Sequence, residues 1–369
     1  MPTKDLHEEP FDESTIAKLE IFEDYAQAWI PTFATPVICI FDFFAGRGYD
    51  VNGVAGSPIR ILDKIREQIV HISAKDVSIK VYLNEFEPDK RDQRKFQLLK
   101  TACDEYLETH LAIKQFIEIK YSNEDFESLF PKLVDEIKKY PSLVYIDQNG
   151  VKFLSEKYLL DLEKTGQTDF LYFVSTSYFW RLGETEEFKK HINIDMTEAK
   201  KDSYKLIHKS VVDQLRRKLP TNTKLKLYPF SLKKGANIYG IIFGASHPRA
   251  VDKFLAIAWK RNATNGEANF DIDDDANKNQ LEMFSGQKLT KIEAFKNKMR
   301  LKVLEGDIQN NFDALQFVYD EGHIGSHAAE CLKEMKKNGE ITFEGISPLV
   351  TYENVHKKSK RVDYKTLKK

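Results

Sequence analysis

The chain has 369 residues, of which 41% are hydrophobic and 31% are charged, and its formal net charge at pH 7 is −1. This length predicts two domains or one large domain with an appendage, and the composition is that of a globular protein rather than a disordered one. The nearly neutral charge excludes a global attraction to nucleic acid, so any such binding has to come from a local patch.

Targeting and redox features are few. No apolar run approaches the roughly 20 residues that cross a bilayer, and the first residues, MPTKDLHEEPFDES, contain no apolar stretch of the signal-peptide kind. The three cysteines, Cys39, Cys103 and Cys331, lack metal-ligand spacing and cannot all pair within one chain. We therefore expect a protein of the reducing cytoplasm without a metal site.

The first half of the chain alternates between apolar runs and amphipathic segments. A helix over residues 12–33 precedes the first strand, and further helices are expected over 59–69, 89–106, 126–139 and 154–164. The expected strands are Val37–Asp42, Ser78–Glu85, Phe116–Tyr121, Leu143–Asp147 and Phe170–Ser175. This alternation predicts a parallel sheet with helices on both faces, and ligands in such sheets bind beyond the carboxyl ends of the strands.

The pattern changes after the fifth strand. Residues 177–220 are mostly helical and charged, and this insertion is long enough that we expect it to cover the carboxyl edge of the sheet. Strands over 224–230 and 238–244 are joined by a short loop, which predicts an antiparallel hairpin that completes the sheet. One more amphipathic helix follows over 248–261.

Residues 271–282, DIDDDANKNQLE, imitate a calcium-binding loop because acids stand at positions one, three, five and twelve. The sixth position is Ala276 where the sharp turn of such a loop needs glycine, and no second loop accompanies it. We interpret this segment as a solvated acidic loop.

The C-terminal part predicts a winged helix. Short helices are expected over 312–321 and 326–338, and two small strands over 339–345 and 349–352. The second helix carries both basic and acidic side chains, so nucleic acid and protein are both open as partners. The last residues, 356–369, hold seven Lys or Arg against one Asp, which predicts either a phosphate-binding tail or a plain solvated one.

Acidic residues end several of the predicted strands. Asp42 is followed by Gly46 and Gly48, which would let the main chain approach a cofactor, although a plain tight turn also needs such glycines. Glu85 ends the second strand 37 positions after Gly48, and Asp147 ends the fourth. Carboxylates at this edge suit a ligand that carries hydroxyl groups and positive charge.

These residues carry a family resemblance. The segment 42–48, DFFAGRG, resembles the first motif of class I S-adenosylmethionine-dependent methyltransferases, segment 84–88, NEFEP, their second, and segment 147–150, DQNG, their fourth. More narrowly, the first helix, the Gly-Ser-Pro at 56–58 and the segment YGIIFGASHP resemble the three-Cys-motif partner (TcmP) family, some members of which end in a winged helix of the GMT type. The similarity spans about residues 12–355.

The resemblance implies a Rossmann-like class I methyltransferase sheet with a terminal antiparallel strand over residues 1–270, a connector over 271–304 and a winged helix with a basic tail over 305–369. It also implies S-adenosylmethionine as the cofactor. The implied cofactor-binding residues are Asp42, Phe44, Gly46, Gly48, Glu85 and Asp125, of which Asp125 would lie near the adenine unless Asn123 or Glu124 does. Asp147 is the implied catalytic acceptor or base.

The fourth motif departs from the family pattern. Amino-methylating DNA enzymes resemble one another in an Asp/Asn-Pro-Pro-aromatic turn, whereas Gln148 stands here in place of proline and no aromatic residue follows. Two functions therefore stay open. One is a methyltransferase acting on nucleic acid or on a nucleic-acid-associated protein, in a mobile-element or phage-defence setting. The other is a non-enzymatic scaffold for the three-Cys-motif protein, a radical-enzyme-like partner.

Overall fold

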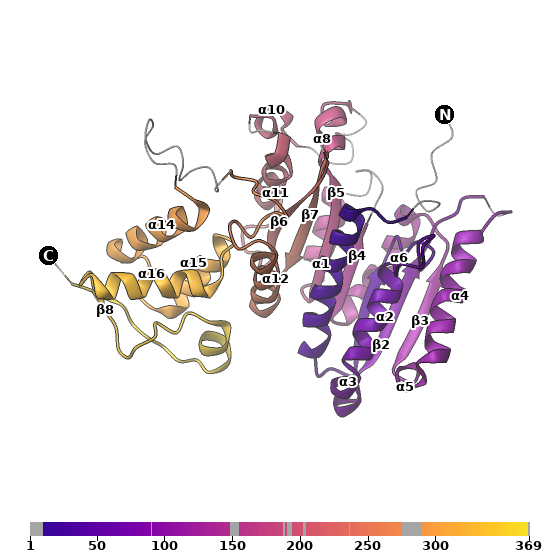
Figure 1. The fold of residues 1–369 in the computed structure, drawn as a ribbon, viewed down its shortest axis with the longest axis horizontal. Helices are drawn as coiled ribbons and strands as arrows, with labels where there is room; N and C mark the ends of the chain where they lie inside the picture. The colour runs from indigo at the N-terminus through magenta and orange to yellow at the C-terminus, as the bar shows by residue number, and fades with distance from the viewer. Residues whose placement is uncertain are drawn as a thin grey trace. The chain divides into compact units, whose positions relative to one another are not determined.

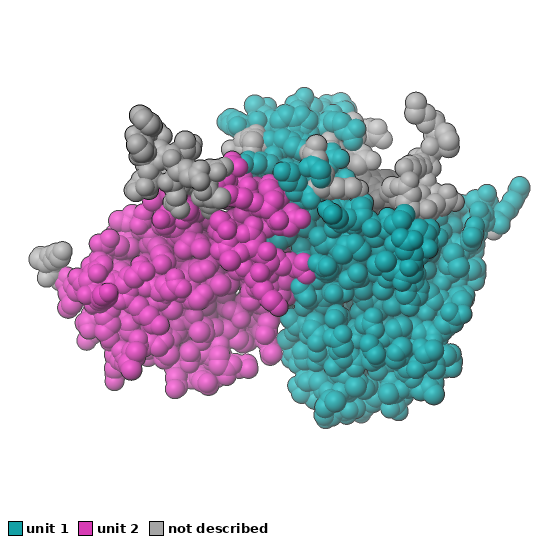
Figure 2. Space-filling view, in the orientation of Figure 1, with its two compact units in different colours: residues 1–247 teal, residues 248–369 magenta. Residues whose placement is uncertain are grey.

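The computed structural model describes residues 10–89, 91–147, 155–186, 189, 194–201, 204–235, 237–274 and 289–367. Figure 1 shows its helices and strands. The chain divides into two compact units, residues 1–247 and 248–369 (Figure 2). The helix at 248–261 therefore belongs to the second unit, whereas the sequence placed the boundary near residue 270.

A seven-stranded sheet with the order β3-β2-β1-β4-β5-β7-β6 forms the centre of the first unit (Figure 1). The first five strands run parallel, and β7 runs antiparallel to both of its neighbours. The strands are β1 (Val37–Asp42), β2 (Ser78–Asn84), β3 (Ile117–Ser122), β4 (Ser142–Ile146), β5 (Thr168–Ser175), β6 (Lys226–Lys234) and β7 (Asn237–Ala245). The prediction of a parallel sheet that ends in an antiparallel hairpin is confirmed.

The burial of each strand explains its pattern of apolar and polar residues. The central strands β1 and β4 are buried along almost their whole length and are nearly continuous apolar runs, as expected for parallel strands covered on both faces. The edge strand β3 instead alternates between half-buried and exposed side chains. In the register, Asp42 lies opposite Leu83 of β2 and Tyr145 of β4, so these three strands end at the same level.

Helices cover both faces of the sheet. Those of the first 163 residues are α1 (Glu13–Trp29), α2 (Ser57–Glu67), α3 (Ile69–Lys75), α4 (Arg94–Thr109), α5 (Leu111–Lys114), α6 (Phe126–Lys139) and α7 (Glu156–Glu163). On one face α1 packs against α2, and α2 against α4. On the other face α6, α7 and α11 (Ile207–Lys218) bury apolar side chains in one cluster with β1, β4 and β5.

The insertion begins at the carboxyl end of β5. Helices α8 (Thr176–Leu182) and α10 (Met196–Ala199) lie beyond the carboxyl edge of the sheet, at the end opposite α3 and α5 (Figure 1). The described part of the insertion therefore lies at the carboxyl edge of the sheet, as the sequence predicted. Helix α11 then returns along β6 and β7, and its His208 is buried beside Gly240.

Gly244 allows the antiparallel strand to pair closely with β5. A Cβ at this position would lie 2.0 Å from Cζ of Phe170, which no real contact permits. We expect Gly244→Ala to lower the free energy of unfolding by about 2 kcal/mol or more, because the ring of a buried core residue has to move. Chemical denaturation measures this loss. Adding Phe170→Leu to Gly244→Ala should recover part of it, and two additive losses would contradict a steric cause.

The second unit is built from helices and a two-stranded sheet. Its elements are α12 (Pro248–Arg261), α14 (Lys291–Glu305), α15 (Asn311–Asp320), α16 (Gly325–Lys337), β8 (Ile341–Thr342) and β9 (Lys365–Thr366). Thr290 and Glu293 form a capping box at the start of α14. The prediction of a strand over 349–352 is wrong, because the partner of β8 is β9.

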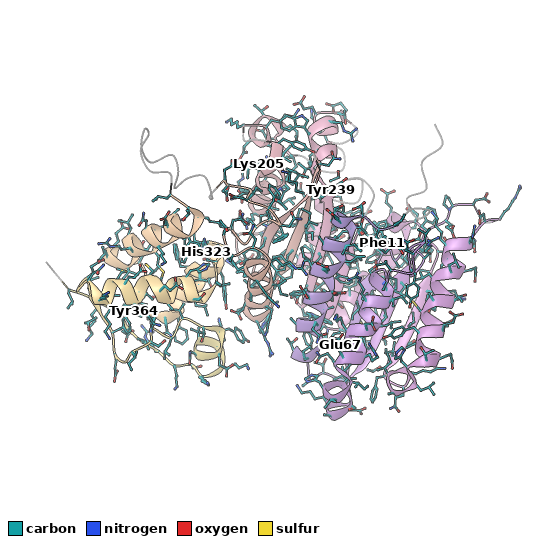
Figure 3. The ribbon with its side chains drawn as sticks, viewed as in Figure 1. Phe11, Glu67, Lys205, Tyr239, His323 and Tyr364 are labelled. Carbon is teal, nitrogen blue, oxygen red and sulfur yellow. The ribbon has the colours of Figure 1, made fainter. Side chains whose placement is uncertain are left out.

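An aromatic cluster forms part of the core of this unit. The ring of His323, which is labelled in Figure 3, lies 4.9 Å from the Trp259 ring and stacks on the Phe295 ring at 4.0 Å. Trp259 Nε1 donates a hydrogen bond to the Gly322 carbonyl. Gly266, with φ +59°, lies against Trp259, where a Cβ would come within 2.4 Å of the indole ring. Helix α12 is thus part of this core, which explains its place in the second unit.

The basic C-terminal segment is not a projecting tail as far as it is described. Val362 and Tyr364 are buried, and residues 365–366 form β9. The Tyr364 hydroxyl donates to the Pro348 carbonyl, and Asn311 exchanges two hydrogen bonds with Val362. Buried apolar and exposed charged residues alternate over 361–365, which is the pattern of an edge strand. The sequence analysis considered only the number of positive charges here and so did not predict this strand.

Candidate functional site at the carboxyl edge

Three acidic residues follow the carboxyl ends of three neighbouring strands. Asp42 is the last residue of β1, Glu85 follows β2 and Asp147 follows β4. The ends align in the register, and the charges of Asp147 and Glu85 both act on Asp42. Phe11 and Tyr239 also lie toward this edge, whereas Glu67 lies at the opposite one (Figure 3). The structure therefore brings together the three acids that the sequence assigned to one site.

Asp42 is almost completely buried, at 1% exposure. Its Oδ2 accepts a hydrogen bond of 2.6 Å from the Ser57 hydroxyl, and its Oδ1 accepts one of 3.1 Å from the Phe44 amide. Burial raises the pKa of Asp42 to about 7 although these two hydrogen bonds oppose the rise, and the nearby charges of Asp147 and Glu85 add to it. Asp42 thus holds the start of α2 on β1 and changes charge near neutral pH.

The glycine turn is closed by hydrogen bonds to its own surroundings. Gly46 and Gly48 have positive φ angles of 68° and 93°, which side chains rarely adopt. The Gly46 amide donates to Glu85 Oε2 at 2.8 Å, and the Gly56 amide donates to the Gly48 carbonyl at 2.8 Å. A Cβ on Gly48 would lie 2.8 Å from that of Ala102 in α4. Gly48 is therefore required by packing alone, and this needs no cofactor.

Asn84 fixes the loops on either side of β2. Its amide nitrogen donates to the carbonyls of Phe43 and Glu124, and its oxygen accepts from the Glu124 amide. Both its amide nitrogen and its amide oxygen are therefore engaged, between the turn after β1 and the loop after β3. Asn84 is a positioning residue that the sequence analysis did not single out, although its place at a strand end beside Glu85 marked it.

Asp125 and Asn123 lie in the loop after β3. Asp125 is the N-cap of α6, since its Oδ2 accepts from the Glu127 amide at 3.0 Å. The Asn123 oxygen accepts from the Glu87 amide at 2.8 Å, whereas its buried amide nitrogen finds no hydrogen-bonding partner in the described part of the chain. The sequence left open which residue of this loop would lie near the adenine. Asn123 has a spare hydrogen-bond donor at this edge, whereas the carboxylate of Asp125 is already used to cap α6.

Phe44 points toward the helix that follows β3. Its ring stacks on Phe126 of α6 at 5.6 Å, and Phe126 itself packs edge-on against Phe43. The Phe44 amide is bonded to Asp42. The half-buried Phe44 ring therefore forms part of the wall between the glycine turn and α6.

Asp147 pairs with a lysine that the sequence analysis missed. Lys18 of α1 forms an ion pair with Asp147 Oδ2, and its ammonium lies 4.2 Å from the centre of the Phe173 ring of β5. The two side chains are 10% and 18% exposed. Lys18 stands on the buried stripe of α1 that also contains Ser14, Phe22 and Tyr25. A lysine within such a stripe is itself a sequence signal for a buried ion pair.

The edge can hold a cationic ligand with hydroxyl groups. Carboxylates accept hydrogen bonds from hydroxyl groups and attract an ammonium or sulfonium, and all three acids stand within one small region. Two further polar atoms near the edge, Asn123 Nδ2 and Thr176 Oγ1, are buried and have no hydrogen-bonding partner among the described residues. Unpaired buried polar atoms are uncommon in native structures, and a bound ligand is one explanation for them.

The second unit contributes a different candidate surface. Of the basic residues on α16, His327 is buried, and Lys336 donates to the carbonyls of Phe343 and Gly345 and so holds the loop after β8. Lys333 and Lys337 remain exposed on this helix. Glu330 and Glu334 are paired with Lys296 of α14. The two acids on α16 that oppose phosphate binding thus share one lysine of α14.

The segment over 353–361 adds further positive charge. Lys357 and Lys358 share the carboxylate of Glu353, and Arg361 pairs with Asp363. Lys360 is exposed. Hydrogen bonds between Asn311 and the main chain of Lys360 and Val362 anchor the end of this segment on the second unit.

The acidic segment 271–282 lies mostly outside the described residues. Within the described part of the chain, no helix has both the length and the apolar character needed to cross a membrane.

Comparison with known families supports the C-terminal part of the interpretation. The family of GMT-like wHTH domains matches residues 269–345, a region that contains α14, α15, α16 and β8. No curated protein matches the chain. The matched region of the second unit is therefore interpreted as a winged-helix domain, a kind of domain that is compatible with nucleic-acid binding.

Proposed function

We propose that the chain is an S-adenosylmethionine-dependent methyltransferase of the three-Cys-motif partner type, acting on nucleic acid or on a nucleic-acid-associated protein. The observation that carries this proposal is the convergence of Asp42, Glu85 and Asp147 at one edge of the sheet beside the glycine turn. A mobile-element or phage-defence setting belongs to the same proposal and rests on the resemblance alone.

The topology supports a Rossmann-like sheet. The order β3-β2-β1-β4-β5 repeats the strand order of doubly wound dinucleotide-binding folds, in which ligands bind where the order reverses, next to β1 and β4. Asp42 and Asp147 stand at that point. The antiparallel β7 between β5 and β6 agrees with the terminal antiparallel strand expected of a class I methyltransferase sheet.

The residues of the edge fit such a cofactor. Glu85 would accept hydrogen bonds from the ribose hydroxyls, and Asp42 would face the positively charged methionine end beside Gly46 and Gly48. The spare amide donor of Asn123 suits a ring nitrogen of the adenine better than Asp125 does. When bound, S-adenosylmethionine supplies an electrophilic methyl group. The chain's own part is to orient the acceptor near Asp147 and to accept a proton there.

Cofactor titration of Glu85 variants tests this proposal. We expect the wild-type chain to bind S-adenosylmethionine or its demethylated product in calorimetry, and Glu85→Ala to bind it at least about tenfold more weakly, because a charged acceptor of two hydroxyls is lost. Glu85 also holds the Gly46 amide, so Glu85→Gln is the matched control. The amide oxygen keeps that contact, and Glu85→Gln should lose affinity less than Glu85→Ala does.

Absence of binding by the wild-type chain would favour the alternative function. The occupied side chain of Asp147 favours that alternative, since a carboxylate already paired with Lys18 need not serve catalysis. The protein would then be a non-enzymatic scaffold for the three-Cys-motif protein. Unchanged affinity in both Glu85 variants would instead remove Glu85 from the site while leaving the cofactor assignment intact.

A further inference from the structure

The insertion after β5 exposes a tryptophan at the carboxyl edge of the sheet. Trp180 of α8 is 38% exposed, whereas Trp29 and Trp259, the other two tryptophans of the chain, are each 3% exposed. Helix α8 is firmly packed, because the neighbouring Phe179 is completely buried and Gly183 at its C-terminal end lies close against α10. A large aromatic side chain is therefore held toward solvent by a helix that is anchored in the core.

Two neighbours fix the orientation of the Trp180 ring. The ring lies edge-on to that of Tyr204, with ring centres 5.5 Å apart and planes inclined by 87°. The ammonium of Lys200 lies 5.7 Å from the centre of the Trp180 ring and pairs with Glu184 at 2.7 Å. An exposed ring that is already oriented loses little conformational entropy when a partner binds to it.

Positive charge surrounds the two rings. Residues 176–218 contain ten Lys or Arg and seven Asp or Glu, although the whole chain has a net charge of −1. Arg181 and Lys201 are exposed, and Lys205, next to Tyr204, is half-buried and lies toward the carboxyl edge (Figure 3). Aromatic rings interleaved with cations are typical of surfaces that bind single-stranded nucleic acid, since bases stack on rings and phosphates attract cations. The excess of positive charge favours a polyanion over a protein segment as the partner.

A cavity adjoins this surface, between the end of α8, α10 and α11. Its volume is about 630 Å³, within the range of small-molecule sites. Glu184, which pairs with Lys200 beside the Trp180 ring, lines the cavity, and so does Arg217 of α11. Arg217 is bonded to Glu198, and a guanidinium has more N–H donors than this one contact uses. The insertion thus combines an exposed ring with a recess that has a cation at its wall.

We propose that Trp180 and Tyr204, with the cations around them, bind a single-stranded segment of the nucleic acid that carries the methyl acceptor. The proposal deepens the methyltransferase function proposed above and rests on it. One base stacks on the Trp180 ring, the neighbouring phosphates lie against Lys200 and Lys201, and the strand continues toward the cavity at Arg217. Because the insertion begins at the carboxyl end of β5, a strand held there is next to the proposed cofactor site.

The tryptophan emission of the full-length chain tests the proposal, because Trp180 is far more exposed than the other two tryptophans. Titration with a 12-mer of dT should quench the emission, and a 12-mer of abasic nucleotides with the same phosphates should not. Fluorescence anisotropy at one fixed salt concentration then compares labelled forms of the two oligonucleotides. The dT 12-mer should bind about fivefold or more tightly, the lower end of what stacking one base on an aromatic ring provides.

Two substitutions of Trp180 separate stacking from charge. Trp180→Ala should abolish the preference for the dT 12-mer and leave the affinity for the abasic 12-mer unchanged. Trp180→Phe keeps an aromatic ring, so it should retain part of the preference and lose the quenching. A control variant with Lys333→Gln and Lys337→Gln should keep both the preference and the quenching, because these two lysines lie on α16 in the second unit.

Four results would overturn the proposal: equal binding of the two oligonucleotides, binding of neither, an unchanged preference in Trp180→Ala, or loss of the preference in the α16 variant. If Trp180→Ala unfolds in thermal melting, the quenching of the wild-type chain and the Trp180→Phe variant still decide. Calorimetry with S-adenosylmethionine separates the two proposals. Cofactor binding without a preference for dT contradicts only this one, whereas a preference without cofactor binding contradicts the methyltransferase function and leaves the binding surface in place.

Discussion

Deletion of residues 361–369 is expected to unfold the winged-helix unit rather than merely to remove positive charge. The deletion takes away the buried side chains of Val362 and Tyr364, strand β9 and the hydrogen bonds to Asn311 and Pro348. Two buried side chains and several hydrogen bonds together contribute about 4 kcal/mol or more, which is a large share of the stability of an ordinary domain. Hydrogen exchange measures the effect, and the amides of α15 and α16 should lose their protection.

Two controls separate folding from charge. Deletion of residues 368–369 alone should leave the protection of α15 and α16 unchanged. Changing Lys357, Lys358 and Lys360 to Gln removes three charges and keeps Val362 and Tyr364 in place, so this variant should stay folded. Its affinity for duplex DNA should fall, and the remaining affinity should depend less steeply on salt. Full protection of α16 in the longer deletion would contradict the structural role of the C-terminal segment.

The parallel strands of the sheet could be predicted because each one is marked by its own local sequence pattern. Strands β1 and β4 are buried on both faces, so their sequences are apolar throughout, and the acids Asp42 and Asp147 mark where they end. Strand β9 was not predictable in the same way. It has two residues, and only its pairing with Ile341 and Thr342 distinguishes it from a charged tail. Short strands depend on a distant partner, which a local pattern does not contain.

The candidate site was predictable in its acids but not in their partners. A topological rule places Asp42, Glu85 and Asp147 at one edge, because parallel strands end together. The hydrogen bond from Ser57 to Asp42 and the ion pair from Lys18 to Asp147 join residues that the sequence separates by 15 and 129 positions. Their pairing follows from the packing of α1 and α2 on the sheet, and no spacing rule supplies it. The division at residue 247 likewise follows from the contact of Trp259 with His323.

Two buried carboxyl groups at opposite edges of the sheet are expected to control the pH dependence of stability. Burial raises the pKa of Asp42 to about 7 and that of Asp169, near the start of β5, also to about 7, from an ordinary value of 3.8. Between about pH 4 and pH 7 the folded chain keeps protons that the unfolded chain has lost. The free energy of unfolding should therefore fall as the pH rises through this range, by up to about 4 kcal/mol for each group.

Replacing each acid by its amide separates stability from binding. Asp169 is bonded to the Tyr25 hydroxyl at 2.7 Å, far from the carboxyl edge, whereas Asp42 stands within the proposed site. Each of Asp42→Asn and Asp169→Asn should remove its own part of the pH slope in urea unfolding, since an amide does not ionise. Asp42→Asn should also weaken S-adenosylmethionine binding by about tenfold or more, because a carboxylate attracts the cationic ligand and an amide does not.

Asp169→Asn is thus the matched control, because Asp169 is also buried and its pKa is also raised to about 7, but it does not contact the site. It should bind the cofactor as the wild-type chain does. In the wild-type chain, affinity for the cofactor should increase as the pH rises through about 7, because Asp42 then becomes charged, and Asp42→Asn should lose this increase. Equal loss of affinity in both variants would show that the amides act through general stability, and Asp42 would then have no direct part in binding.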